Sequence, residues 1–289
     1  MGALHIGNNV IIPTVVKTVE TGHRYGASMN TFFGDEIQTE TGIELSKPST
    51  LTDILIPNVT KFGQSLFVYK FYANDSIRSF SAPDLDFAGY ACLNNTFTNC
   101  KNLVSVTLGN QNKEITTNGG RQDWLRNAFT GCSNLTNVYI NLITVNGNDL
   151  YYSFSNCTSL TSNPIPSIQI IGSTASDTLC MGYCYNGCTS LENFIFDNVR
   201  TIFGSRALEY SFNNCTKLKS LSFPALISVQ DSQQGYTNTN QFHGMLSGCS
   251  NVTVHFPSNM QAKIGNWTDV TNGFGGTNTT FLFDLEATE

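Results

Sequence analysis

The nine cysteines of this chain are the residues whose side chains are best suited to chemistry. Cys180, Cys184 and Cys188 follow one another at intervals of four residues, which on a helix would place the three thiols on one face. Thiolates are zinc ligands, but a zinc site also needs a fourth ligand, and no histidine lies close to these cysteines in the sequence. We therefore expect neither a metal centre nor a bound cofactor.

The spacing of the reactive residues does not indicate a catalytic site. His5, His23, His243 and His255 are scattered, and no serine lies in the G-x-S-x-G motif of the serine hydrolases. A catalytic thiol must be accessible, activated and close to a base. Six cysteines instead recur at one slot of a repeat, which predicts that they are buried. We expect no enzymatic activity.

The repeat consists of an aromatic residue, two small polar residues, a cysteine, two further residues and a leucine. It reads F-T-N-C-K-N-L from Phe97, F-T-G-C-S-N-L from Phe129, F-S-N-C-T-S-L from Phe154, Y-N-G-C-T-S-L from Tyr185, F-N-N-C-T-K-L from Phe212 and, weakened, L-S-G-C-S-N-V from Leu246. A repeat of this length indicates a solenoid, in which each unit packs only against its neighbours.

Stacked repeats place equivalent side chains one strand spacing apart, about 4.8 Å. The Cβ atoms of a disulfide are closer than that, at about 3.8 Å. We therefore predict that the cysteines of the repeat form a buried ladder of free thiols that act as small apolar fillers. The ladder comprises Cys100, Cys132, Cys157, Cys188, Cys215 and Cys249.

Each repeat also predicts a strand. Apolar residues lie three and five positions after the leucine, as Leu221 and Phe223 do after Leu218, and Pro224 then ends the strand. The leucine slots recur at a basic period of about 26 residues, which gives about eight units. Between aromatic residue and cysteine we expect one short helical turn. The fold class is thus an α/β, β-rich solenoid.

The repeat does not extend to either end of the chain. Residues 1–48 lack it and are predicted to be a cap or attachment module, residues 49–257 form the solenoid, and residues 258–289 form a C-terminal cap. Caps are required because a terminal repeat would otherwise expose its apolar face. We therefore expect three segments, of which only the middle one is repetitive.

Composition restricts the partners. Only 12% of residues are charged and the net charge is −6, which argues against nucleic acid because phosphate binding needs a basic face. No apolar run approaches the length of a membrane span, and Met1–Val10 lacks the features of a secretory signal. We therefore expect no membrane insertion.

The motif from Phe212 to Pro224, F-x-x-C-x-x-L followed by L-x-F-P, resembles the BspA-like leucine-rich repeat family. The resemblance covers roughly residues 49–257. It implies a right-handed superhelix with a parallel sheet on one face. It also implies a surface-exposed microbial protein that binds host proteins or other cells and is not an enzyme.

The two ends carry a second resemblance. Leu4–Asn8 is similar to the openings of phage tail proteins, and the closing run through Phe281–Asp284 resembles the ends of repeat proteins from gut bacteria and their phages. We expect a phage tail-associated adhesion protein, located in the virion or at a cell surface. A purely structural virion component and a bacterial cell-surface adhesin remain alternatives. Expected partners are a host cell-surface protein or glycan and, through residues 1–48, other virion or surface proteins.

Ligand contacts are expected in the loops and on the sheet. The insertions Gln111–Arg121, Gly172–Thr178 and Gln230–Gln241 follow the strand in their repeats, so they should emerge from one side of the solenoid. Exposed aromatic residues favour binding. The candidate ligand-binding residues are Arg121, Trp124, Tyr139, Tyr151, Tyr152, Tyr236 and Gln241. A column of small polar residues along the strands, such as Ser79 and Ser105, is a further candidate surface.

Overall fold

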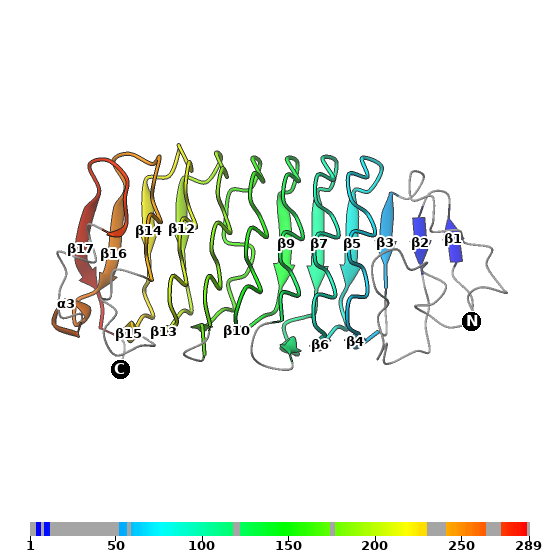
Figure 1. The fold of residues 1–289 in the computed structure, drawn as a ribbon, viewed down its shortest axis with the longest axis horizontal. Coiled ribbons are helices and arrows are strands. Elements are labelled where there is room, and N and C mark those ends of the chain that lie inside the picture. The colour runs from blue at the N-terminus through cyan, green and yellow to red at the C-terminus, as the bar shows by residue number, and fades with distance from the viewer. Residues whose placement is uncertain are drawn as a thin grey trace.

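The chain coils about eight times into a solenoid of parallel strands with almost no helix (Figure 1). The computed structural model describes residues 4–6, 9–11, 52–56, 59–117, 122–173, 177–229, 241–263 and 273–287, and of the first two ranges only the backbone. The predicted solenoid and its parallel sheet are therefore confirmed. The strands are joined by turns, and α3 (Met260–Lys263) is a short helix near the C-terminal end.

The main sheet runs along one face of the solenoid in two parts. The first part has the order β1 (Leu4–Ile6), β2 (Asn9–Ile11), β3 (Asp53–Leu55), β5 (Ser79–Ala82), β7 (Ser105–Leu108) and β9 (Asn137–Ile140). The second has β12 (Asn193–Ile195), β14 (Ser220–Ser222), β16 (Thr253–Pro257) and β17 (Thr280–Leu285). Neighbours are parallel except β1 and β2. The sheet therefore includes strands from both segments outside the predicted repeat.

Two proline residues interrupt the main sheet between β9 and β12. Pro164 and Pro166 have no N–H group to donate to a ladder, and residues 161–166 form no strand. The Asn163 side chain bridges part of the gap, because its Nδ2 atom donates to the Ile195 carbonyl at 2.8 Å and its Oδ1 atom accepts from the Ile165 N–H at 3.0 Å. An amide side chain thus takes over backbone pairing that proline cannot make.

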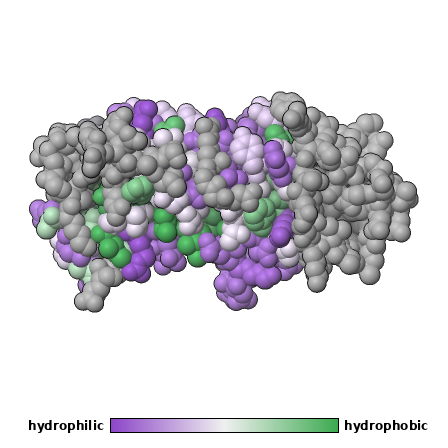
Figure 2. All heavy atoms as spheres, turned by 60° about the horizontal axis from the view of Figure 1, so that its bottom comes forward, coloured by the Kyte–Doolittle hydropathy of each residue, from purple (hydrophilic) through white to green (hydrophobic). Residues whose placement is uncertain are grey.

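A second row of short strands follows the main sheet in each coil and lies along the lower edge in Figure 1. It comprises β4 (Lys61–Phe62), β6 (Phe87–Ala88) and β8 (Thr116–Thr117), then β10 (Thr144–Val145), β11 (Ile170–Ile171), β13 (Thr201–Ile202) and β15 (Ser228–Val229). All three predicted insertions adjoin strands of this row. On this side, hydrophobic side chains form small separate patches between hydrophilic ones (Figure 2).

The expected helical turn before each cysteine is wrong. Each coil instead has a run of β-turns, such as the one closed by the Lys70 N–H and the Phe67 carbonyl at 2.9 Å. Alternate N–H groups point to the next coil, and that of Phe71 donates to the Thr96 carbonyl at 3.0 Å. A helix would use these donors internally. We call the surface formed by residues 64–74, 90–100, 122–132, 147–157, 179–188, 205–215 and 241–249 the turn face.

A left-handed residue recurs every four positions in the turn face and makes this path possible. In one coil these residues are Ala91, Asn95 and Asn99, with φ of 52°, 54° and 62°. Such a residue ends each right-handed turn before a helix can form. The Asn and Gly residues of the repeat therefore specify a pleated run of turns.

The residue before each ladder cysteine alternates between Asn and Gly. The pairs from successive coils are Asn99 and Gly131, Asn156 and Gly187, and Asn214 and Gly248. A Cβ atom on each glycine would come within 2.2–2.4 Å of the Oδ1 atom of the preceding asparagine. The alternation therefore lets each asparagine amide lie over the backbone of the next coil.

The core is built from stacked aromatic side chains and thiols. The inner stack runs through Phe71, Phe97, Phe129, Phe154, Tyr185 and Phe212, with neighbouring ring centroids 5.1–5.8 Å apart. All nine cysteines are free and buried. Each ladder thiol donates to the carbonyl of an aromatic residue one coil earlier, as Cys157 does to Phe129 at 3.2 Å. Burial raises the pKa of the Cys100 thiol to about 12.

Candidate functional site

The expectation that Trp124 and Gln241 lie on the surface is wrong, because both side chains are fully buried. Each stands five positions before the aromatic slot of its coil, occupied by Phe129 and Leu246 respectively. This position faces the core throughout, and Cys92 and Cys180 occupy it in other coils. A position within or beside an insertion therefore did not indicate exposure.

Arg121 and Tyr236 lie outside the described residues. Tyr139 is half-buried on β9, on the outer side of the main sheet. Tyr151 and Tyr152 are half-buried on the turn face. Of the predicted ligand-binding residues, these three tyrosines are the ones that the structure places at the surface.

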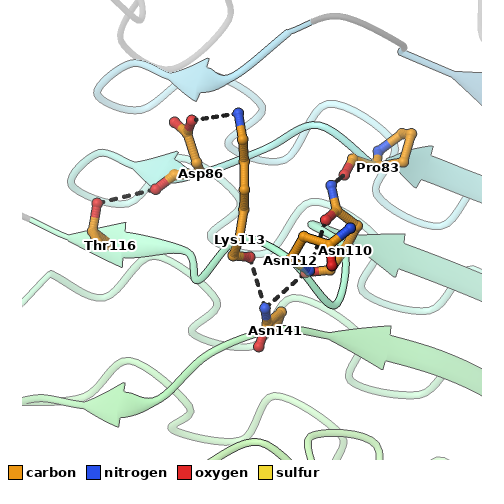
Figure 3. A network of polar contacts seen from close by, with 7 residues as sticks. All are labelled: Pro83, Asp86, Asn110, Asn112, Lys113, Thr116 and Asn141. Carbon is orange, nitrogen blue, oxygen red and sulfur yellow. Dashed lines mark hydrogen bonds and ion pairs between the residues drawn. The ribbon is translucent and has the colours of Figure 1, made fainter.

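The start of the first insertion is held as a fixed polar turn (Figure 3). The Asn110 side chain donates to the Pro83 carbonyl at 2.8 Å, and the Asn141 Nδ2 atom donates to the carbonyls of Asn110 and Lys113, both at 2.7 Å. Lys113 also forms an ion pair with Asp86 at 3.4 Å. These bonds join three successive coils, so this turn braces the solenoid.

A strip of tyrosines on the turn face is the strongest candidate site. Tyr152, Tyr183 and Tyr210 come from three successive coils, and their rings stack with centroids 4.5 and 5.0 Å apart and interplanar angles of 7° and 23°. Tyr151 packs edge to face against Tyr152 at 4.6 Å. All four side chains are partly exposed. We call these four residues the tyrosine strip.

The stacked tyrosines occupy one defined position, two residues before the aromatic slot of the coil. The backbone there is left-handed, with φ of 56° at Tyr152, 54° at Tyr183 and 50° at Tyr210. A left-handed conformation costs a residue with a Cβ atom about 1–2 kcal/mol. Asn95 and Asn127, which tolerate it better, hold the same position in other coils. Tyrosine is thus placed where backbone preference disfavours it.

Sequence reasoning found Tyr151 and Tyr152 but missed Tyr183 and Tyr210. The signal was present, because the residue two positions before the aromatic slot is tyrosine in three successive repeats. A glycine follows in the next coil, where a Cβ atom on Gly244 would come within 2.3 Å of the Tyr210 ring. The strip therefore ends at Tyr210, whose ring occupies the space left by the missing side chain of Gly244.

The phenol groups of Tyr152 and Tyr183 remain protonated at neutral pH. Burial, followed by the neighbouring Tyr151 and Tyr183, raises the pKa of Tyr152 to about 12. Burial, followed by Glu209, also raises the pKa of Tyr183. Neutral phenols can both donate and accept hydrogen bonds.

Charges beside the strip are compensated. Arg126 lies over the Tyr151 ring, 5.1 Å from its centroid, and 3.9 Å from the Asp123 carboxylate. Arg206 forms an ion pair with Glu209. The surface around the tyrosines is therefore polar without a dominant sign of charge.

A row of amides runs beside the strip, three positions further along each coil. The Asn186 side chain donates to the Ser155 hydroxyl at 3.0 Å, and the Asn213 side chain donates to the Asn186 side-chain oxygen at 2.7 Å. Asn186 and Asn213 are half-buried. The coils of Tyr183 and Tyr210 thus each offer a tyrosine and an amide on the same face.

The outer side of the main sheet is a different kind of surface. Its first column pairs Asp53, Ser79, Ser105 and Asn137 in register, in agreement with the predicted column of small polar residues. Its second column includes Ile195 and Leu282, which are 45% and 39% exposed. Tyr139 contributes an aromatic ring. Among the described residues, this side therefore combines small polar groups with scattered apolar ones and has no stack of aromatic rings.

The described residues offer no ready metal site. No group of three or more His, Cys, Asp or Glu side chains in this part of the chain is arranged to hold a metal ion. Cys180, Cys184 and Cys188 lie in the turn face with their thiols buried. None of the helices that the structure describes has the length and apolar character needed to cross a membrane.

The sequence of the repeat matches a known family model. The model of the BspA type leucine rich repeat region, in six copies, matches residues 68–180, 93–232 and 181–268, which together span more than half of the chain. This chain belongs to the BspA-type leucine-rich repeat family. The tyrosine strip lies within the matched BspA-type region.

Two solved structures are similar to this BspA-type chain. A leucine-rich repeat protein of T. pallidum is 16% identical, with 79% of this chain and 86% of that chain covered and a TM-score of 0.32. A leucine rich cell surface protein of Faecalibacterium prausnitzii is 14% identical, with 78% and 87% covered and a TM-score of 0.27. No curated protein sequence matches this chain.

Proposed function

We propose that this chain is a non-enzymatic recognition protein that acts in adhesion at a microbial surface and holds its ligand on the tyrosine strip. The observation that carries the proposal is the stack of Tyr152, Tyr183 and Tyr210, which are partly exposed and fixed by one another. Tyrosine supplies a large amphipathic contact area at low entropic cost. A surface that is already ordered loses little freedom when a ligand binds.

The state of the thiols supports a role other than catalysis. Burial raises the pKa of the Cys132, Cys157 and Cys215 thiols well above the ordinary value. A nucleophilic cysteine needs an accessible thiol with a lowered pKa. The cysteines of this chain therefore serve packing, and the partly exposed aromatic groups are the better candidates for function.

Cell binding tests the proposal directly. Labelled full-length protein is incubated with a panel of bacterial and epithelial cells, and bound protein is measured by flow cytometry. We expect Tyr183→Ala to weaken binding at least about tenfold, because truncating an aromatic residue at the centre of a binding site typically lowers the affinity by this much. Tyr139→Ala, on the main sheet, is the matched control and should bind like the wild type. Loss of binding in the Tyr139 variant alone would instead assign the ligand to the sheet.

A location on a phage tail is the finer form of the proposal. It rests on the sequence resemblance of the two chain ends, with residues 1–48 as the attachment segment. The parallel pairing of β2 with β3 places part of this segment on the end of the main sheet. Its deletion would uncover the edge of β3 as well as abolish incorporation into particles. Co-purification of the full chain with tail particles, and its loss on deletion, would support this location, whereas a full chain absent from the particles would contradict it.

A further inference from the structure

We infer that the tyrosine strip binds an extended, uncharged glycan that runs along the axis of the solenoid. The inference rests on the proposed recognition function and names the class of ligand. Three features of the strip carry it: the balance of charge around the rings, the spacing of the rings, and the groups that the stack leaves accessible.

Charge balance disfavours an ionic ligand. Arg126 is shared between the Tyr151 ring and Asp123, and Arg206 is paired with Glu209. A phosphate, a sulfated polymer or nucleic acid would need cations that are not already engaged. The uncharged polar groups on this surface are phenols and the amides of Asn186 and Asn213. Each amide keeps donor and acceptor positions beyond the bonds it already makes, and these suit neutral hydroxyl groups.

Stacking leaves ring edges, not ring faces, for a ligand. Tyr183 has Tyr152 on one side and Tyr210 on the other, with centroids 4.5 and 5.0 Å away. A nucleic-acid base or a quaternary ammonium group binds to an open aromatic face, which Tyr183 does not offer. Because the three side chains are partly exposed, a ligand on this face would meet the outer edges of the rings. A sugar presents alternating C–H and O–H groups, which suits such an edge.

The spacing of the rings separates a glycan from an extended peptide. Side chains on one face of an extended peptide recur at about 6.8 Å. The rings recur at 4.5 and 5.0 Å, so a peptide would lose register with them after one coil. A pyranose chain linked through opposite sides of its rings advances by roughly one coil spacing per sugar. Neighbouring sugars in such a chain are turned over relative to one another, so each sugar would meet one coil and every second sugar would present the same edge to the strip.

The first test treats the cells to which the wild-type protein binds. Periodate, which cleaves the vicinal diols of sugars, should reduce binding at least tenfold, and protease should leave it nearly unchanged. The uncharged polysaccharide fraction from these cells should compete for binding, and the acidic fraction should not. The inference of an uncharged glycan would be overturned if protease removed binding and periodate spared it. It would also be overturned if only the acidic fraction inhibited binding. Wild-type protein that binds no cell in the panel would instead refute the proposed function.

The second test asks whether the phenol hydroxyl makes the contact. Tyr183→Phe keeps the stacked ring and removes one hydroxyl group, so affinity for the uncharged polysaccharide fraction should fall about tenfold by isothermal titration. Tyr90→Phe, which changes an exposed tyrosine of the turn face outside the strip, is the control and should bind like the wild type. Equal thermal unfolding of both variants shows that the fold is intact. A Tyr183→Phe variant with wild-type affinity would overturn the inference.

Discussion

Two aromatic stacks run side by side through this solenoid, and they differ in what they do. The inner stack, from Phe71 to Phe212, is fully buried and continues through six coils. The outer stack consists of Tyr152, Tyr183 and Tyr210, each two positions before the inner-stack residue of its coil. It is partly exposed and occupies only three coils. The inner stack fills the core and is needed for the coils to pack. The outer stack has a similar ring spacing but lies at the surface, where the core does not require aromatic residues.

Backbone conformation sharpens this difference. The outer tyrosines sit in left-handed conformations that asparagine or glycine would adopt at lower cost, as Asn95 and Gly244 do. A costly residue type kept in three neighbouring coils points to a function beyond folding. Stability and ligand binding should therefore respond in opposite ways to substitutions in the two stacks.

The largest expected effect lies in the core beside the inner stack. Cys157→Asp would bury a carboxylate among apolar groups, where the thiol now donates to the Phe129 carbonyl. We expect a loss of unfolding free energy on the order of 5 kcal/mol. Urea unfolding followed by circular dichroism measures it, with Cys157→Ala as the control that adds no charge. An unchanged transition in the Asp variant would mean that Cys157 is not a core position.

The two stacks can be compared directly with one substitution in each. Phe129→Ala should lower the unfolding free energy by about 4 kcal/mol, because it leaves a large cavity in a fully buried column. Tyr183→Ala should lower it by less than about 1 kcal/mol while reducing cell binding. Denaturant unfolding and flow cytometry on both variants give the comparison. Equal stability losses would show that the outer stack is structural.

A smaller effect is expected where asparagine meets glycine. Gly131→Ala places a Cβ atom 2.3 Å from the Asn99 Oδ1 atom at a backbone φ of 74°, which should cost about 2 kcal/mol. Adding Asn99→Gly removes the clash but not the backbone strain. The double variant should therefore recover part of the loss in a double-mutant cycle. Purely additive losses would show that the two residues do not touch.

The smallest effect concerns a buried carboxyl group. Burial raises the pKa of Asp149 well above its ordinary value, and its Oδ1 atom has no hydrogen-bond partner within the described part of the chain. The unfolded chain therefore loses this proton first as the pH rises, so stability falls between the unfolded-state and folded-state pKa values. Asp149→Asn should remove this fall, whereas the exposed Asp197→Asn should not. Parallel pH profiles of wild type and Asp149→Asn would contradict it.

The periodic parts of the fold could be predicted because the same sequence pattern recurs in each repeat. The leucine slots, the strand register and the column of Ser79 and Ser105 follow from spacing alone. The turn face could not be read in this way, because short polar residues suit both a helical turn and a run of β-turns. What decides is the left-handed residue every fourth position, and only Asn99 and its equivalents hint at it.

The candidate site was half visible for a similar reason. Tyr151 and Tyr152 stand out as neighbours in the sequence, whereas Tyr183 and Tyr210 become their partners only when the coils are stacked in register. Trp124 and Gln241 were misplaced because an insertion next to a repeat does not shift the positions that face the core. Exposure follows from the slot within the coil, not from the length of the loop.

The alternation of asparagine and glycine before the cysteines also fixes how such a solenoid can grow. Asn99, Asn156 and Asn214 each need a glycine in the following coil, supplied by Gly131, Gly187 and Gly248. Inserting or deleting a single coil between them would set asparagine over asparagine or leave two glycines in succession. Over this stretch, the unit that can be duplicated without a clash is therefore a pair of coils, twice the repeat seen in the sequence motif.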